Sequence, residues 1–182
     1  MWSSEVTNMI IAGIGETLYM TLVSTIAGYI IGLPMGIVLT VSDKDGIRPN
    51  SFIYKILDVI VNIVRSIPFI ILLVLLIPFT RFLVGKSYGS TATIVPLVVA
   101  AAPYIARMVE SSLKEVDAGV IEAARSMGAS DFDIVTKVLL VEARTSLLVG
   151  ATISLGTILG YSAIKASRVL SVWEAVMTLK KY

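Results

Sequence analysis

Long runs of uncharged, mostly apolar residues are the main pattern along the chain. No charged residue occurs at positions 17–42, 87–106 or 145–164. A helix that crosses a bilayer needs about 20 predominantly apolar residues, so each run is long enough to span a membrane. A further apolar run contains Asp58 and Arg65 but is uncharged after Arg65. The pattern therefore predicts four transmembrane helices, at about 17–41, 56–80, 88–108 and 145–164.

The segments around these spans define the expected organisation. Residues 1–16 form an N-terminal lead-in whose apolar positions recur at helical spacing, so it is either an amphipathic helix or a frayed extension. Residues 17–164 make one transmembrane domain. Its one long polar connection covers residues 109–144 and lies between two apolar runs. Residues 165–182 follow the last span as a tail.

Composition indicates an all-α integral membrane protein. Of 182 residues, 56% are hydrophobic and only 15% are charged, and the mean hydropathy is +0.88, which is unlike a soluble domain. A net charge of +2 without a basic, aromatic-rich patch argues against nucleic-acid binding. There is no cysteine or histidine, which excludes disulfides, thiolate or imidazole metal ligands and histidine-dependent nucleophilic catalysis. We expect no metal, no cofactor and no catalytic residue.

The distribution of lysine and arginine predicts the orientation in the membrane. If the spans alternate in direction, the 42–55 and 109–144 segments share one side, where most of the basic residues lie. The opposite side holds only Arg81 and Lys86 before the tail. The positive-inside rule places the long connection in the cytoplasm and the N-terminus outside. The basic residues on the cytoplasmic side are Lys44, Arg48, Lys55, Arg107, Lys114, Arg125, Lys137 and Arg144.

Two features of the spans suggest specific roles. Glycines spaced four residues apart let helices approach closely in lipid; we interpret them as packing residues within the chain, with a dimer contact or a pathway role as alternatives. Arg65 is costly inside a bilayer, so it either reaches the headgroups with its long side chain or has a function in the translocation pathway. The glycines are Gly28, Gly32, Gly36, Gly156 and Gly160.

The polar stretch at 120–140 predicts two short helices. Asp117 can cap the first, Gly128 can end it, and Ser130 can begin the second. Each helix has an apolar face. On these grounds alone the segment is either a surface for another protein's groove or a helical layer lying on its own membrane domain.

The stretch "EAARSMGASDFDIVTKVLL" resembles the EAA loop of ABC-importer permeases. That loop has the pattern Glu-Ala-Ala, three residues, Gly, nine residues, an apolar residue, any residue, Leu and Pro. Residues 62–81, 102–130 and 155–164 are similar to the methionine-import branch of these permeases, and the similarity covers roughly residues 5–164. The positions in register are Glu122, Ala123, Ala124, Gly128, Val138 and Leu140, while Val141 replaces the proline.

The resemblance implies a role in transport without bond chemistry. In such importers two permease copies, here a homodimer, form the pathway in the bacterial inner membrane, and a cytoplasmic ATPase subunit hydrolyses ATP. An extracytoplasmic binding protein delivers the substrate, here methionine or a related amino acid. Arg65 resembles an arginine in the second-helix segment of that branch, and a role in the translocation pathway remains one of the two expectations for it. The residues that couple to the ATPase are Glu122, Ala123, Ala124 and Gly128.

One departure leaves alternatives open. The branch continues with a Gly-rich loop and a fifth helix, whereas this chain reads "KASRVLSVWEAVMTLKKY" after Ile164. We therefore expect an atypical or truncated C-terminus, and a truncated or frameshifted remnant that does not transport, or a small membrane interaction protein, is the alternative function. An intramembrane enzyme is a third interpretation. The proposed spans argue against it, because Asp58 is the only acidic residue inside them.

Overall fold

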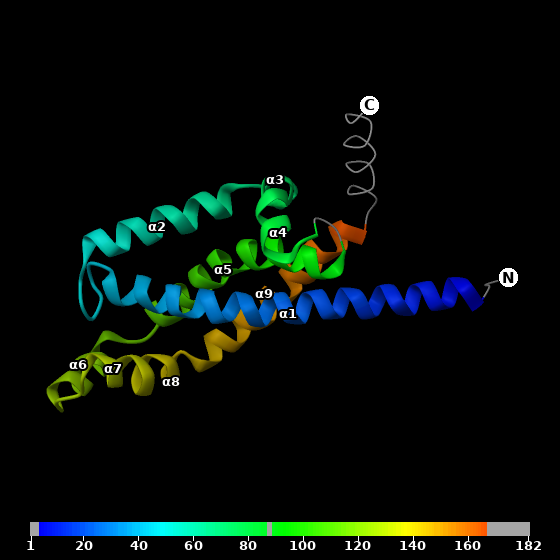
Figure 1. Cartoon of the computed structure of the whole chain (residues 1–182). Coiled ribbons are helices and arrows are strands. Elements are labelled where there is room, and N and C mark those ends of the chain that lie inside the picture. Colours follow the sequence, from blue (N-terminus) through cyan, green and yellow to red (C-terminus); the bar gives the residue numbers. More distant parts are fainter. Residues whose placement is uncertain (1–3, 87–88, 167–182) are drawn as a thin grey trace.

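The computed structural model describes residues 4–86 and 89–166, and every element in these ranges is helical. The predicted all-α fold is confirmed. Figure 1 shows the helices as an elongated bundle, with the N-terminus at one end. The elements are α1 (Ser4–Ser42), α2 (Ser51–Ser66), α3 (Phe69–Leu75), α4 (Ile77–Val84), α5 (Ser90–Lys114), α6 (Ala118–Ser126), α7 (Asp131–Asp133), the π-helical segment η1 (Ile134–Leu139), α8 (Leu140–Glu142) and α9 (Arg144–Ala166).

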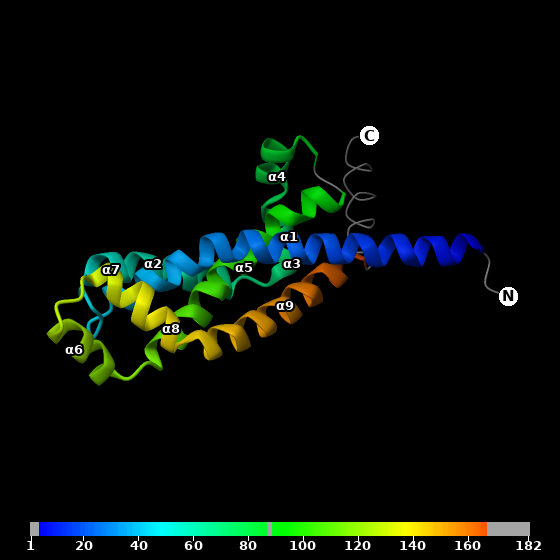
Figure 2. The same ribbon diagram turned by 90° about the horizontal axis from the view of Figure 1, so that it is seen from below.

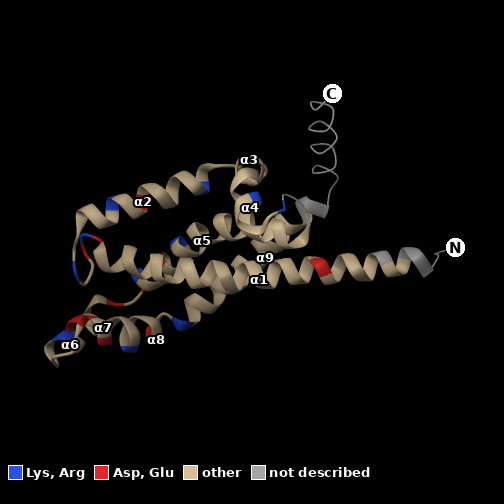
Figure 3. Ribbon diagram, in the orientation of Figure 1, with Lys and Arg blue, Asp and Glu red and all other residues tan. Residues whose placement is uncertain are grey.

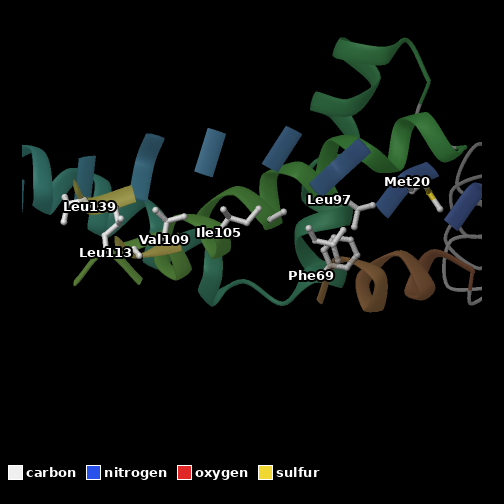
Figure 4. Close-up of a cluster of buried hydrophobic side chains, with 10 residues drawn as sticks. Met20, Phe69, Leu97, Ile105, Val109, Leu113 and Leu139 are labelled. Carbon is white, nitrogen blue, oxygen red and sulfur yellow. The ribbon is translucent and has the colours of Figure 1, made fainter. Parts of the chain in front are cut away.

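Helix α5 is the centre of the bundle and contacts α1, α2, α3, α4 and α9. One row of its side chains, four residues apart, is at most 1% exposed. Positions spaced by four lie on one face of a helix, so a single stripe of α5 supplies much of the core. Figure 4 shows this row continuing from Met20 and Phe69 at one end to Leu139 at the other. The buried row of α5 is Leu97, Ala101, Ile105, Val109 and Leu113.

The contact between α1 and α5 depends on glycine. A Cβ atom added to Gly32 would lie 2.6 Å from the carbonyl oxygen of Ala102, and one added to Gly36 would lie 2.6 Å from that of Ala106. Both distances are far shorter than a van der Waals contact, so the two backbones approach this closely only without a side chain on α1. Gly28 is less tightly placed, with its nearest neighbouring atom at 3.0 Å from an added Cβ.

Gly156 and Gly160 of α9 differ from the glycines of α1. No atom of the described chain lies within 4 Å of a Cβ added to either residue. These two glycines therefore do not support a close contact between the described helices. Helix α9 instead meets α1 through a buried contact between the hydroxyls of Thr21 and Ser162, 3.3 Å apart, and meets α3 through the stacked rings of Phe69 and Tyr161.

Three helices of the described chain are long and apolar enough to cross a membrane: Ile10–Ser42, Ser90–Lys114 and Arg144–Ser162. The run predicted as one span at 56–80 is broken instead, because α2 and α3 meet at a bend of 103°. Ile67 is extended (φ −82°, ψ 123°), as expected for a residue before proline, and Pro68 cannot donate the backbone hydrogen bond that would continue α2.

The structure describes most of the N-terminal segment but little of the C-terminal tail. The predicted lead-in at 1–16 is continuous with the first span from Ser4 onwards, so α1 has no boundary near residue 16. Two glycines in this segment, Gly13 and Gly15, do not interrupt the helix. Most of the predicted tail at 165–182 lies outside the described residues, which end at Ala166.

Replacing a contact glycine of α1 should destabilise the protein. We expect Gly32→Ala and Gly36→Ala each to lower the free energy of unfolding by about 1–3 kcal/mol, the usual cost of overpacking. Thermal unfolding of the detergent-solubilised chain measures the change. Gly15→Ala is the matched control, because no atom lies within 4 Å of its added Cβ. Equal melting temperatures for all three variants would contradict the close contact.

Candidate functional site

The polar stretch of the sequence forms a separate layer at one end of the bundle. We call this the loop end; it consists of residues 43–50 together with α6, α7, η1 and α8, and Figure 2 shows it opposite the N-terminus. Most of the charged residues of the described chain also lie toward this end (Figure 3). The long apolar helices thus carry a charged cap on one side, which is where a water-soluble partner could reach them.

Local signals fix both ends of α6. The carboxylate of Asp117 accepts a hydrogen bond from a backbone N–H of the first turn at 2.7 Å. At the other end Gly128 is left-handed (φ 82°), its N–H donates to the carbonyl of Arg125, and the N–H of Ala129 donates to that of Ala124. This pair of bonds is the Schellman ending, which favours glycine at the left-handed position. Asp117 and Gly128 therefore end this helix as the sequence indicates.

The four residues of the EAA pattern take three different positions. Glu122 and Ala123 are exposed on α6, whereas Ala124 is only 5% exposed and faces the bundle. Gly128 shapes the turn after the helix. Beside the exposed pair, Met127 is 82% exposed. The outward side of α6 therefore offers a carboxylate, a small side chain and a flexible apolar side chain, and its inward side packs on η1.

A cleft and one hydrogen bond connect α6 to the membrane helices. The guanidinium of Arg125 donates to the carbonyl of Ile47 at 2.8 Å, and Ile47 packs against the main core. Between α6 and the bundle lies a cleft of about 420 Å³, lined in part by Asp43, Lys114 and Glu122. The segment that follows α1 is thus held directly by α6.

Beneath α6 a network of charged side chains joins three helices. Arg107 of α5 pairs with Asp58 of α2 and donates to Asn62 at 2.9 Å and to Glu110 at 2.6 Å. Lys114 continues the network. Because Arg107 and Asp58 are partly buried where α2 and α5 meet, each charge needs a partner nearby to offset the loss of water. The network provides this with two cations and one anion of α5, completed by Asp58 of α2 and by Asp43 from the segment after α1.

Glu110 is the most buried member of this network, at 4% exposure. Its carboxylate accepts hydrogen bonds from Lys114 at 2.8 Å, from Arg107 and from the hydroxyl of Tyr54. Lys114 also pairs with Asp43 at 2.6 Å, and the hydrogen bond from Lys114 lowers the pKa of the Asp43 carboxyl below its usual range. The ends of α1, α2 and α5 are therefore tied together around one carboxylate.

Arg65 lies away from the loop end, in the last turn of α2. Its side chain lines a cavity of about 260 Å³ next to the 103° bend, together with residues of α3, α5 and α9. In residues 4–86 and 89–166, no group of three or more histidine, cysteine or acidic side chains is placed to hold a metal ion. The outward side of α6 and this cavity are the places where the structure puts the sequence-predicted site residues Glu122, Ala123 and Arg65.

Residues 28–166 match the family described as the binding-protein-dependent transport system inner membrane component. The match covers well over half of the chain. The chain belongs to this family. It is a transport subunit of the inner membrane and not an enzyme, and the family assignment favours the permease over the alternative reading as a non-transporting remnant.

Individual relatives point to one branch of the family. The chain is 54% identical over 156 residues to the D-methionine transport system permease protein MetI of Salmonella typhimurium and to that of Escherichia coli K12, covering 86% of this chain and 72% of each relative. It is 41% identical over 163 residues to the probable MetI of Vibrio cholerae, covering 90% of this chain and 72% of that protein. The predicted resemblance to methionine-import permeases is confirmed.

Solved structures agree with these relatives. The fold matches a chain of the inward-facing MetNI methionine ABC transporter with a TM-score of 0.88 and 53% identity, covering 90% of this chain and 76% of that chain. An amino acid ABC transporter with 23% identity matches with a TM-score of 0.72, covering 96% of this chain and 81% of that chain. At that identity the second match supports the fold alone. The bundle around α5 is therefore a permease fold.

The ion network is the part of the site that the sequence did not predict. Arg107 was expected only as a basic residue of the cytoplasmic side, and Asp58 only as an acid inside a span. The spacing of Arg107, Glu110 and Lys114, three and then four residues apart, places their side chains on one face of a helix. That spacing is a detectable signal for the α5 part of the network. No local pattern reveals the partner on α2, which is 49 positions away in the chain.

Removing the buried carboxylate should destabilise the permease. Glu110→Ala leaves the partly buried Arg107 and the exposed Lys114 with fewer partners, and we expect the free energy of unfolding to fall by about 1–3 kcal/mol, the usual cost of leaving a buried hydrogen-bonding group without its partner. Thermal unfolding in detergent measures this change. The control is Asp45→Ala, since Asp45 pairs with Lys44 where both side chains are more than 80% exposed. A melting temperature for Glu110→Ala equal to that of the control would contradict the network's role.

Proposed function

We propose that this chain is the membrane-spanning permease of an ATP-driven importer for methionine or a related amino acid. The relatives at 54% identity are D-methionine permeases, and the structure at 53% identity belongs to a methionine ABC transporter. Two copies of the chain form the pathway, with an extracytoplasmic binding protein delivering substrate on the side of the N-terminus. Exposed apolar residues along α1, α2 and α9 give the bundle enough surface for both lipid and a second copy.

The docking site for the ATPase subunit is the outward side of α6. Glu122 and Ala123 are exposed there, with Glu122 at the rim of the cleft between α6 and the bundle, and Gly128 ends the helix sharply after them. A small alanine allows close approach of a partner, and a carboxylate pairs with a basic partner residue. Ala124 contributes from beneath by packing α6 onto the permease. The single observation that carries the proposal is this exposed EAA surface on a helix that is bonded to the membrane helices.

The contacts beneath α6 give a route by which a motion of the ATPase reaches the membrane helices. A displacement of α6 pulls on the segment after α1 through Arg125 and Ile47. That segment is tied through Asp43 to Lys114, and the network passes to α2 at Asp58. Packed and ion-paired elements move together more readily than they deform. The ends of α1, α2 and α5 therefore move as one body when α6 is displaced.

Reversing the charge on α6 should uncouple the permease from its ATPase. We expect Glu122→Arg to reduce co-purification of the ATPase subunit at least about tenfold, because like charges facing each other across an interface cost several kcal/mol. The same variant should lose methionine uptake in reconstituted liposomes. Glu142→Arg is the control, since Glu142 is an exposed acid of α8, outside α6. ATPase capture by Glu122→Arg at the wild-type level would contradict the docking site.

The proposed orientation places the loop end in the cytoplasm and the N-terminus outside. Lysine and arginine are concentrated at the loop end (Figure 3), which favours the cytoplasmic side. The chain has no cysteine, so single cysteines can report accessibility without background.

In intact spheroplasts, we expect Lys86→Cys to react with a membrane-impermeant maleimide and Lys44→Cys to remain unreactive. The pattern should reverse in inside-out vesicles. Both side chains are exposed in the structure, so a lack of reaction reports the membrane side and not burial within the chain. Labelling of Lys44→Cys in intact spheroplasts would overturn the orientation.

A further inference from the structure

The cavity beside the bend has a composition that the coupling role of the loop end does not explain. Its volume is about 260 Å³, and four helices line it. Drug-sized ligands occupy pockets of about 300–1,000 Å³, so this space suits a smaller molecule, on the scale of one amino acid. The lining residues that matter here are Arg65 of α2, Phe69 and Leu72 of α3, Ala100 and Tyr104 of α5, and Tyr161 of α9.

The position of Arg65 makes its charge expensive. It follows Ser51, the first residue of α2, by 14 positions, which is about 21 Å along a helix. A bilayer core is about 30 Å thick, so Arg65 lies well inside the membrane when α2 enters it from the loop end. An arginine reaching toward the headgroups at the loop end cannot cover that distance. Arg65 is exposed at the side of the single chain, and within the described part of the chain it makes no hydrogen bond or ion pair.

The backbone at the cavity is also unusual for its depth. Helix α2 ends at Ser66, Ile67 is extended, and α3 begins at Phe69 after a bend of 103°. Irregular backbone at membrane depth is tolerated where it is buried in protein or lines a cavity. Broken helices of this kind form the substrate sites of other classes of transporter. The break and the uncompensated arginine therefore mark the same place.

The wall of the cavity has one cationic part and one aromatic part. A guanidinium binds a carboxylate with two parallel hydrogen bonds. The rings of Phe69 and Tyr161 stack with centroids 4.7 Å apart and planes 12° from parallel, and a thioether makes favourable contacts with aromatic rings. Leu72 and Ala100 complete an apolar surface. These groups match the two ends of one molecule, an α-carboxylate and an apolar or thioether side chain.

We propose that this cavity binds the transported amino acid inside the permease, with Arg65 holding its carboxylate and the stacked Phe69 and Tyr161 rings contacting its side chain. This inference rests on the proposed function, which supplies methionine as the substrate. It assigns selectivity to the permease itself, in addition to any selectivity of the binding protein. It also gives the charge of Arg65 a compensating partner during transport.

Direct binding of radiolabelled methionine tests the site. The full-length chain is purified in detergent with its ATPase subunit and without the binding protein. We expect saturable binding, and we expect Arg65→Gln to weaken the affinity roughly 10- to 150-fold. This is the change in affinity that hydrogen bonds to a charged group usually contribute. Arg81→Gln is the control, because Arg81 is an exposed arginine of α4 that does not line the cavity. Methioninol, which has a hydroxymethyl group in place of the carboxylate, should compete poorly against the wild type.

A second variant tests the cavity without removing the arginine. Ala100→Leu adds bulk to the wall contributed by α5 and should weaken methionine binding while Arg65 stays in place. ATPase co-purification shows whether each variant is assembled. If Arg65→Gln fails to assemble, Arg65→Lys keeps the charge, loses the two-pronged geometry, and should bind methionine with intermediate affinity.

Uptake by reconstituted wild-type protein separates this inference from the proposed function. Uptake of methionine together with no saturable binding, or with binding unchanged by both Arg65→Gln and Ala100→Leu, overturns the site and leaves the function standing. Absence of uptake by wild-type protein that has assembled with its ATPase and received binding protein contradicts the proposed function. In that case the binding measurements still decide whether the cavity holds a carboxylate.

Discussion

The buried carboxylate of Glu110 is the interaction on which the loop end of the bundle depends. It is 4% exposed and lies between Arg107 and Lys114, so the cost of removing this carboxylate from water is offset mainly by its attraction to the two cations. Such a cluster is stable only when every member is present and well placed. Because Asp58 and Asp43 complete it from two other segments, the relative positions of α1, α2 and α5 at this end are fixed by charge compensation as well as by packing.

The glycine contact between α1 and α5 sets the distance at which that network can form. Gly36 meets the backbone of α5 at Ala106 and the side chain of Val109, adjacent in sequence to Arg107 and Glu110. A bulkier residue at this point would separate the ends of the two helices. Asp43 would then lie farther from Lys114, whose ammonium group it now meets at 2.6 Å. The glycines of α1 in the membrane thus set the distance between the two members of an ion pair outside it.

Much of the architecture follows from local sequence signals. The uncharged runs locate α1, α5 and α9, because backbone buried in lipid must form long helices. Asp117 and Gly128 mark the two ends of α6, because capping interactions act within one turn. The break after Ile67 has a local cause in Pro68 as well, but hydropathy averaged over the run at 56–80 conceals it. The pairing of Asp58 with Arg107 has no local cause at all. It arises only when α2 packs on α5, so it could not be predicted from either segment.

Helix α2 connects the two sites of the molecule. Asp58 and Arg65 are seven residues apart on it, or about two turns, so their side chains leave the helix on nearly the same side. One belongs to the network beneath α6, and the other lines the cavity at the bend. A rigid displacement of α2 together with α5 that begins at the network therefore moves the guanidinium of Arg65 relative to the α3 and α9 walls of the cavity. The bend at Pro68 lets α3 keep its stacking contact with α9 while α2 moves, so ATPase motion at one end can change the shape of the proposed substrate cavity at the other.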